Sequence, residues 1–184
     1  RFLFENFQIA KETFEEGSDA LGLDMKKLCF EGSEADLALT ENTQPALLLV
    51  STATQRVLTK DFGIKAVAGA GHSIGEYAAL VAAQVINFSD SMKAVRTRGQ
   101  AMQSAVPVGK GGMVEKSGFG PLSPANFNCP GQIVISGSQQ AIDWLKDNFK
   151  PEVIWSEAPK RAKMIPLSVS APFHCEMMMP AENK

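Results

Sequence analysis

The sequence has no apolar run near the roughly 20 residues that a membrane-spanning helix requires. It also has no charged segment followed by an apolar stretch and a small-residue cleavage site, which is the pattern of a secretory signal. We therefore expect a soluble, cytoplasmic protein. With 184 residues and 45% hydrophobic content the chain can bury a core, and one domain with a small inserted subdomain is the simplest organisation.

Side chains that bind metals or form disulfides are scarce. The chain has three cysteines, Cys29, Cys129 and Cys175, and two histidines, His72 and His174. The cysteines are widely spaced and form no C-x-x-C pair, the spacing that zinc sites commonly use. We expect reduced thiols, no metal site and no tightly bound cofactor.

An excess of charge of either sign is also missing. The 18 basic and 20 acidic side chains are scattered along the chain and give a net charge of −2. A protein that binds nucleic acid usually gathers its lysines and arginines into a basic stripe or patch. We expect no nucleic-acid partner.

The first half of the chain has the apolar periodicity of helices. Four segments predict helices: residues 7–21, 43–58, 76–83 and 89–105. Gly22 follows the first as a stop signal, and Pro45 stands in what we take as the first turn of the second, which should lie in the core. A short apolar run at 65–70 predicts a strand.

The pattern changes beyond residue 107. Short apolar runs at 132–136, 153–155 and 163–167 predict strands, and residues 139–149 predict a helix between the first two. The polar, proline-marked segment 121–131 predicts a loop. Strands and a helix in this order and size fit a small α+β subdomain.

The segment Gly71-His72-Ser73-Ile74-Gly75 matches G-x-S-x-G, the nucleophile elbow of serine acyl-transfer enzymes. The predicted strand before it and helix after it give the required context. Glycines are needed because the nucleophile sits on a sharp, strained turn that leaves no room for neighbouring side chains. A chance match in a glycine-bearing loop is the alternative.

Ser73 would then stand at a helix N-terminus, where the backbone N–H of Ile74 can stabilise an oxyanion. A serine also needs a base. His72 is adjacent to Ser73 on a tight turn, so its ring should point away from the hydroxyl. His174 follows Pro172 in an extended segment before an expected helix and is the better candidate, although a structural histidine is the more common case.

The elbow with Glu76, Tyr77 and the following alanine-rich run closely resembles the signature of the malonyl-CoA:acyl-carrier-protein transacylases. The segment 170–175, Ser-Ala-Pro-Phe-His-Cys, resembles the second signature of that family. The resemblance implies that Ser73 is the nucleophile and His174 its base.

Arg98 follows Ser73 by 25 positions and precedes a glycine, as an arginine does in these transacylases. The resemblance implies that Arg98 binds the free carboxylate of malonate. A planar guanidinium can hold a carboxylate through two parallel hydrogen bonds. From the residues alone, however, Arg98 cannot be distinguished from Arg96 or Arg56.

Four further residues are assigned to substrate binding by the same resemblance. Gln44 and Asn128 lie in segments that border the family's active-site cleft, but each could instead cap a turn or helix. Phe173 would restrict bulky acyl groups, or it is an ordinary core aromatic. The fourth is His72.

The resemblance implies an α/β fold in which residues 1–107 and 167–184 form an α/β-hydrolase-like core. Residues 108–166 would form an inserted, small ferredoxin-like α+β subdomain. The family's Gly-Gln-Gly turn with a second oxyanion donor, part of its small subdomain and its C-terminal portion have no counterpart in the sequence. We therefore expect an incomplete catalytic domain.

The activity implied is transfer of malonyl groups from malonyl-CoA to acyl carrier protein for fatty acid biosynthesis, by a monomer, with coenzyme A as product. Three alternatives stay open. They are a serine esterase or thioesterase, an acyltransferase domain of a polyketide synthase, and an inert module that binds carrier protein.

Overall fold

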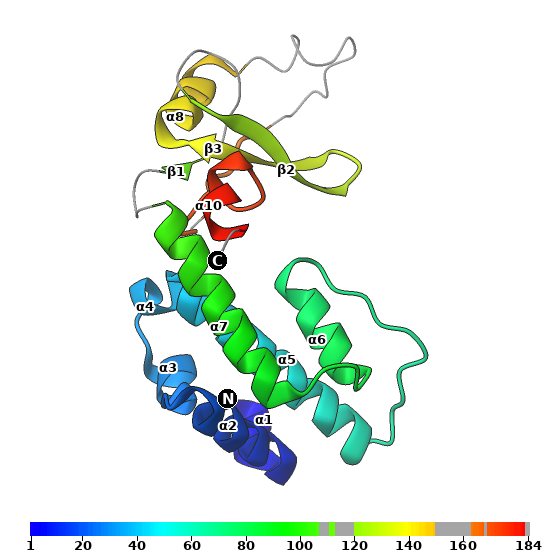
Figure 1. The fold of residues 1–184 in the computed structure, drawn as a ribbon. Helices are drawn as coiled ribbons and strands as arrows, with labels where there is room; N and C mark the ends of the chain where they lie inside the picture. The colour runs from blue at the N-terminus through cyan, green and yellow to red at the C-terminus, as the bar shows by residue number, and fades with distance from the viewer. Residues whose placement is uncertain (107–110, 113–119, 150–162, 168, 183–184) are drawn as a thin grey trace. The chain divides into compact units, whose positions relative to one another are not determined.

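The computed structural model describes residues 1–106, 111–112, 120–149, 163–167 and 169–182. The chain forms two compact units, residues 1–100 and residues 101–184, and each has its own buried core. The elements are α1 (Phe2–Asn6), α2 (Gln8–Leu21), α3 (Met25–Glu31), α4 (Glu34–Ala38), α5 (Thr40–Lys60), α6 (Ile74–Ala82), α7 (Phe88–Ala105), β1 (Gly111–Gly112), β2 (Leu122–Cys129), β3 (Gln132–Ser138), α8 (Gln139–Asn148), η1 (Glu176–Met178) and α10 (Met179–Glu182) (Figure 1).

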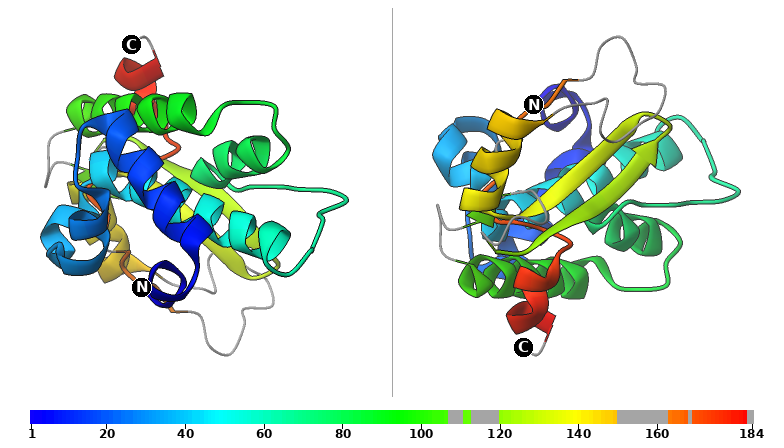
Figure 2. Two further views of the ribbon diagram at one scale, coloured as in Figure 1. Left: turned by 90° about the horizontal axis from the view of Figure 1, so that it is seen from below. Right: turned by 90° about the horizontal axis from the view of Figure 1, so that it is seen from above.

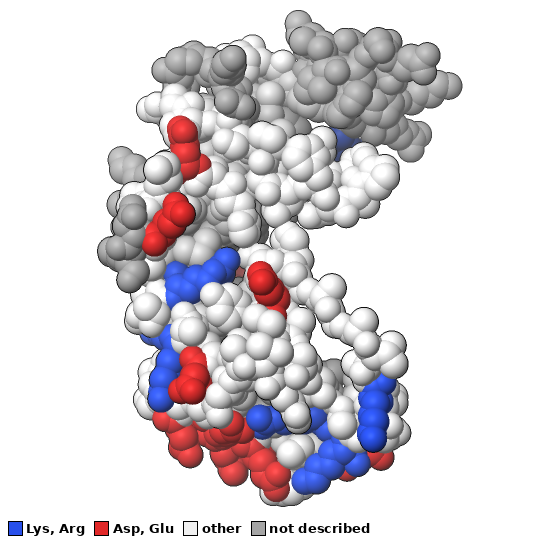
Figure 3. Space-filling view, turned by 45° about the vertical axis from the view of Figure 1, so that its right-hand side comes forward, with Lys and Arg blue, Asp and Glu red and all other residues white. Residues whose placement is uncertain are grey.

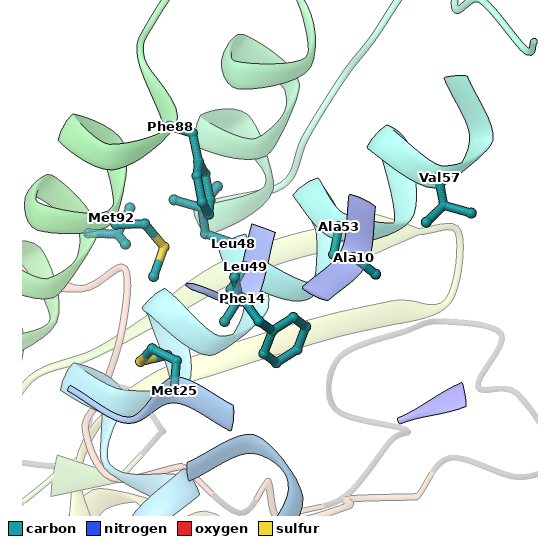
Figure 4. Close-up of a cluster of buried hydrophobic side chains, with 10 residues drawn as sticks. Ala10, Phe14, Met25, Leu48, Leu49, Ala53, Val57, Phe88 and Met92 are labelled. Atoms are coloured by element: carbon teal, nitrogen blue, oxygen red, sulfur yellow. The ribbon is translucent and has the colours of Figure 1, made fainter. Parts of the chain in front are cut away.

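Helix α5 is the centre of the first unit and packs against α2 and α6. Its core is made by buried side chains from α2, α3, α5 and α7 (Figure 4): Ala10, Phe14, Met25, Leu48, Leu49, Ala53, Val57, Phe88, Met92 and Val95. Gly17 of α2 lets the helices approach, because a Cβ atom there would lie 2.9 Å from Leu49 Cδ1 and 3.3 Å from Met92 Cε. The predicted burial of residues 43–58 is confirmed for the side of α5 that carries Leu48, Leu49, Ala53 and Val57.

Helices α2 and α7 confirm their predictions almost residue for residue. Helix α2 ends before Gly22, whose φ of 63° places it in the left-handed region that glycine adopts without steric cost. Helix α6 begins at Ile74, two residues earlier than predicted. Helices α1, α3 and α4 are short and were not predicted.

The predicted start of α5 is wrong, because the helix begins at Thr40 and Pro45 lies inside it. A proline has no N–H to donate to the carbonyl four residues earlier, here that of Glu41. A side chain supplies the missing donor: Arg96 Nη1 of α7 lies 2.7 Å from the Glu41 carbonyl oxygen. The sequence pattern could not show a contact made by a second helix.

The strand predicted at 65–70 is also not formed. Residues 1–100 are all described and contain no strand, so this segment has no neighbour with which to pair. It runs as exposed, extended chain between α5 and α6 (Figure 2).

The second unit contains a three-stranded antiparallel sheet in the order β1-β3-β2, and α8 contacts β1 and β3. The loop predicted at 121–131 is wrong, because β2 occupies most of it. Pro124 is tolerated there because β2 is an edge strand with a register shift between Pro124 and Asn126. Gly131, with φ 83°, forms the turn into β3.

The remaining expectations for this unit have mixed outcomes. Strand β3 and α8 confirm the predictions for 132–136 and 139–149. The run 153–155 lies outside the described residues. Residues 163–167 form no strand, since no described segment pairs with them.

The division into compact units differs from the predicted domains at both boundaries. The second unit begins at Ala101, before the predicted boundary at 108, and it also includes the segment after residue 167 that was assigned to the large domain. One physical cause is a hydrogen bond from Ser136 Oγ on β3 to the Phe173 carbonyl oxygen, 2.5 Å long. The mixture of helices and sheet agrees with the predicted α/β class at that coarse level.

Charges of both signs are interspersed on the face of the molecule drawn in Figure 3. Acidic and basic side chains also pair, as in the Lys60–Glu12 contact of 3.8 Å. Within the described ranges, no helix combines the length and the apolar character needed to cross a membrane.

The core makes a prediction that two leucines of α5 can test. Leu49 is fully buried, whereas Leu47 is 49% exposed. We expect Leu49→Ala to lower the free energy of unfolding by about 2–5 kcal/mol through the lost apolar contacts and the cavity left behind. Leu47→Ala should change it by less than about 0.5 kcal/mol. Urea denaturation of the 184-residue chain measures both, and equal effects would contradict this packing.

Candidate active site

Ser73 stands at the N-cap of α6 in a strained backbone conformation, with φ 53° and ψ −110°. A positive φ is unfavourable for a residue with a Cβ atom and is found where the surrounding structure enforces it. The turn is closed by hydrogen bonds from the Gly75 N–H to the His72 carbonyl, 2.9 Å, and from the Glu76 N–H to the Ser73 carbonyl, 3.2 Å. The tight turn and the helix after it are those that the G-x-S-x-G motif predicted, whereas the predicted strand before the turn is not formed. The role of Ser73 as nucleophile stays a prediction.

The two glycines of the elbow have different roles. A Cβ atom on Gly71 would lie 1.9 Å from the carbonyl carbon and oxygen of Gly75 and 2.3 Å from the Glu76 nitrogen, so the turn requires glycine there. A Cβ atom on Gly75 would meet no atom of the described residues within 4 Å.

The start of α6 gives this site a favourable electrostatic environment for an anion. The first amides of a helix have no carbonyl partner within the helix, and the helix dipole adds partial positive charge at this end. Ile74 is the first residue of α6 and directly follows Ser73. Its N–H as an oxyanion donor stays a prediction.

Arg98 of α7 extends to the elbow and contacts the serine. Its Nη2 donates to Ser73 Oγ at 3.1 Å, and its Nη1 donates to Gln44 Oε1 at 2.5 Å. Gln44 comes from α5, is 5% exposed, and donates from Nε2 to Thr40 Oγ1 at 2.9 Å. The structure thus brings together three residues that the sequence selected from separate segments.

The other two candidate arginines have different partners. Arg56 forms an ion pair with Glu16 at 2.6 Å and lies over the Phe88 ring, 4.9 Å from its centroid. Arg96 binds the first turn of α5. Of these three arginines, Arg98 is the one that contacts Ser73. Its role in binding a carboxylate stays a prediction.

His174 lies in the second unit on a loop that β3 holds in place. Its backbone has φ 57°, and its side chain is exposed. The buried hydroxyl of Ser136 donates to the Phe173 carbonyl, and Cys175 Sγ lies 3.2 Å from the Pro172 carbonyl. Sequence reasoning missed Ser136, although a serine ending an apolar strand run was a visible signal.

The other predicted residues occupy varied positions. His72 is exposed within the elbow, Asn128 is exposed near the end of β2, and Phe173 is half-buried beside His174. Ser73 and His174 belong to different units, so their pairing stays a prediction, as do the roles of His72, Asn128 and Phe173.

Three further observations concern titratable and metal-binding side chains outside this cluster. Burial raises the pKa of the Cys29 thiol in α3, so that thiol is a poor nucleophile at neutral pH. The exposed Asp143 on α8 has a lowered pKa because Lys146 and Gln139 hydrogen-bond to it. Among the residues with described positions, no three metal-binding side chains cluster.

Residues 7–160 match the acyl transferase domain family. The chain belongs to this family. The malonyl CoA-acyl carrier protein transacylase of Salmonella typhimurium is 43% identical over 194 residues, which cover 97% of this chain and 60% of the relative. The protein of the same name from Bacillus subtilis is 40% identical over 198 residues, covering 99% and 60%.

Solved structures agree with this assignment to the acyl transferase family. The acyl-carrier-protein S-malonyltransferase of Burkholderia pseudomallei matches with a TM-score of 0.81 at 40% identity, covering 98% of this chain and 61% of that one. A malonyl-transacylase in complex with a type II polyketide synthase carrier protein matches with a TM-score of 0.82, 40% identity, and coverages of 98% and 61%. The predicted resemblance is confirmed, and the chain spans about 60% of the length of the curated relatives above.

The elbow geometry predicts opposite outcomes for its two glycines. Gly71→Ala should abolish labelling of Ser73 by a fluorophosphonate probe, because the added methyl group would overlap the backbone of the turn. Gly75→Ala should retain labelling, because the methyl group meets open space and alanine favours a helix. Labelling is read by intact-protein mass, and full labelling of Gly71→Ala would contradict the described turn.

Proposed function

We propose that the complete protein transfers the malonyl group of malonyl-CoA to the phosphopantetheine thiol of acyl carrier protein, supplying fatty acid biosynthesis. One observation carries this proposal: the Arg98 guanidinium contacts Ser73 Oγ at 3.1 Å while Gln44 holds its other amino group. A serine beside a fixed cation suits an acyl group that carries its own negative charge.

The chemistry of malonate matches this spacing. In a malonyl ester of Ser73 a single methylene separates the ester carbonyl from the free carboxylate, so the carboxylate must lie close to Ser73 Oγ. Each amino group of a guanidinium has two N–H donors, so the bond to Gln44 leaves donors on both for a carboxylate. An acetyl group would leave the half-buried cation unpaired, which disfavours it.

The reaction would proceed in two half-steps. Ser73 Oγ, deprotonated by His174, attacks the thioester carbonyl; the C–S bond breaks, and coenzyme A leaves with the proton. The carrier thiol then attacks the ester, the C–O bond breaks, and Ser73 regains its proton. The Ile74 N–H would stabilise the oxyanion in both steps.

The finer fold expectations form part of the proposal. They are an α/β-hydrolase-like core around Ser73 and a ferredoxin-like subdomain over 108–166. The relatives are longer than this chain, which leaves residues for the rest of such a core. Acyl carrier protein as partner is supported by the relatives' names and by the carrier-protein complex of one neighbour. A monomeric, cytoplasmic enzyme is proposed with them.

A serine esterase would require different groups in the site. Transfer to water needs the elbow and a base but no cation facing the acyl group. The bonds from Arg98 to both Ser73 and Gln44 therefore favour the malonyl transferase.

The test is intact-protein mass of the full-length protein after brief incubation with malonyl-CoA or acetyl-CoA. We expect a malonyl adduct that moves to added carrier protein and is absent in Ser73→Ala. Arg98→Ala should lower malonyl loading by about 10- to 100-fold, because a charge-assisted interaction is lost, and should leave acetyl loading unchanged or raise it, because the unpaired cation that disfavours acetyl is removed.

The controls separate the alternatives. Arg56→Ala removes a helical arginine whose partner is Glu16, so it should leave the preference for malonyl unchanged. Transfer of the acyl group to water but not to carrier protein would support the esterase. No adduct on the wild-type protein would contradict the proposal.

A further inference from the structure

The helix that carries Gln44 contains a defect one residue later. Pro45 lies inside α5 and cannot donate to the Glu41 carbonyl, which therefore lacks its partner within the helix. An unpaired carbonyl in a half-buried helix is unfavourable, and proline also tends to bend a helix. The first turn of α5 thus needs support from outside the helix.

Arg96 of α7 supplies this support. Its Nη1 donates to the Glu41 carbonyl at 2.7 Å and to Asn42 Oδ1, and its Nη2 lies 3.6 Å from Glu41 Oε2. The side chain of Arg96 is 21% exposed and that of Glu41 30%. Asn42 in turn donates from Nδ2 to the Asp36 carbonyl at 2.9 Å. One guanidinium therefore fixes both the backbone and the side chains of this turn.

Gly99, one turn further along α7, brings the two helices into backbone contact. A Cβ atom at Gly99 would lie 2.6 Å from Glu41 Cα and 2.7 Å from the Thr40 carbonyl oxygen. Arg98 lies between these two contact positions on the same helix. The packing of α7 against the start of α5 is thus fixed at Arg96, before Arg98 in the sequence, and at Gly99, directly after it.

The supported turn also carries the partner of Gln44. Thr40 Oγ1 accepts from Gln44 Nε2, and Gln44 Oε1 accepts from Arg98. A displacement of residues 40–42 would move Thr40, and with it the amide that holds Arg98 against Ser73. Hydrogen bonds, together with the chain segment 40–42, thus connect Arg96 continuously with Ser73.

We propose that Arg96 is a positioning residue for the carboxylate-binding site. By replacing the hydrogen bond that Pro45 cannot make, it fixes the first turn of α5, and through Gln44 it orients Arg98 toward Ser73. The effect of Arg96 on acyl selectivity rests on the proposed malonyl transfer, whereas its effect on the position of Arg98 does not.

Kinetics of the full-length protein test the selectivity. Arg96→Ala should lower kcat/KM for malonyl-CoA by roughly tenfold, mostly through KM, because a misplaced Arg98 binds the carboxylate less well. The kcat/KM for acetyl-CoA should stay within about twofold, since acetyl has no carboxylate. Arg96→Lys should recover part of the loss, because a lysine keeps the charge but cannot reproduce the paired contacts.

Arg56→Ala is the matched control, because Arg56 is also a half-buried helical arginine in an ion pair, with 28% side-chain exposure. It should leave the malonyl-to-acetyl ratio unchanged even if it lowers stability as much as Arg96→Ala does. A ratio that changes equally in both variants, or not at all in Arg96→Ala, would overturn the proposal. If Arg96→Ala fails to fold, Asn42→Ala removes one contact of Arg96 without unpairing the Glu41 carbonyl and should lower the ratio by a smaller factor.

A crystal structure separates this proposal from the proposed function. In Arg96→Ala the bond between Arg98 Nη1 and Gln44 Oε1, 2.5 Å here, should lengthen or break. An unchanged bond would overturn the positioning role even if the protein transfers malonyl groups. A displaced Arg98 in a protein that shows no malonyl adduct would support positioning and contradict only the malonyl substrate.

Discussion

The guanidinium of Arg98 connects α5, α6 and α7 at a single point, and the arrangement of the site depends on it. It starts on α7, binds Gln44 of α5, and reaches Ser73 at the start of α6. A long, flexible side chain can hold one geometry only if its contacts are themselves fixed, because ordering such a side chain costs conformational entropy. Gln44 is buried and bound to Thr40, and the backbone contact at Gly99 sets the spacing of the helices. The first unit therefore presents a cation to the serine in a defined position before any substrate binds.

The elbow adds a second source of positive potential to the same small region. Ser73 is forced into a positive φ by a turn that only a glycine at position 71 permits, and α6 begins with the next residue. The serine oxygen thus lies near both a formal charge and the partial charge of a helix N-terminus. In the proposed reaction these two groups would suit two different negative charges, the carboxylate of the malonyl group and the oxyanion. Because each group would stabilise a different charge, the site would need both Arg98 and the N-terminus of α6.

The sequence predicted the parts of the site that depend on local patterns. The tight turn at Ser73 and the helix after it followed from the G-x-S-x-G motif, the selection of Arg98 followed from the resemblance, and Gly22 marked the end of α2 correctly. What failed depended on partners far along the chain. The strand at 65–70 lacks a neighbour in the first unit, β2 forms because β3 pairs with it, and α5 starts at Thr40 because other parts of the chain support its first turn. Arg96 and Ser136 act through contacts with distant backbone carbonyls. The end of an apolar run marks Ser136 in the sequence, but no local pattern identifies the carbonyl that either side chain binds.

The most direct test of this account is a crystal structure of the full-length Ser73→Ala variant with malonyl-CoA bound. The account predicts that both amino groups of Arg98 lie within hydrogen-bond distance of the malonyl carboxylate, with Gln44 still bound to Nη1 and the thioester carbonyl next to residue 73. A carboxylate bound elsewhere, with Arg98 in contact only with protein groups, would contradict the central claim that this arginine recognises the acyl group.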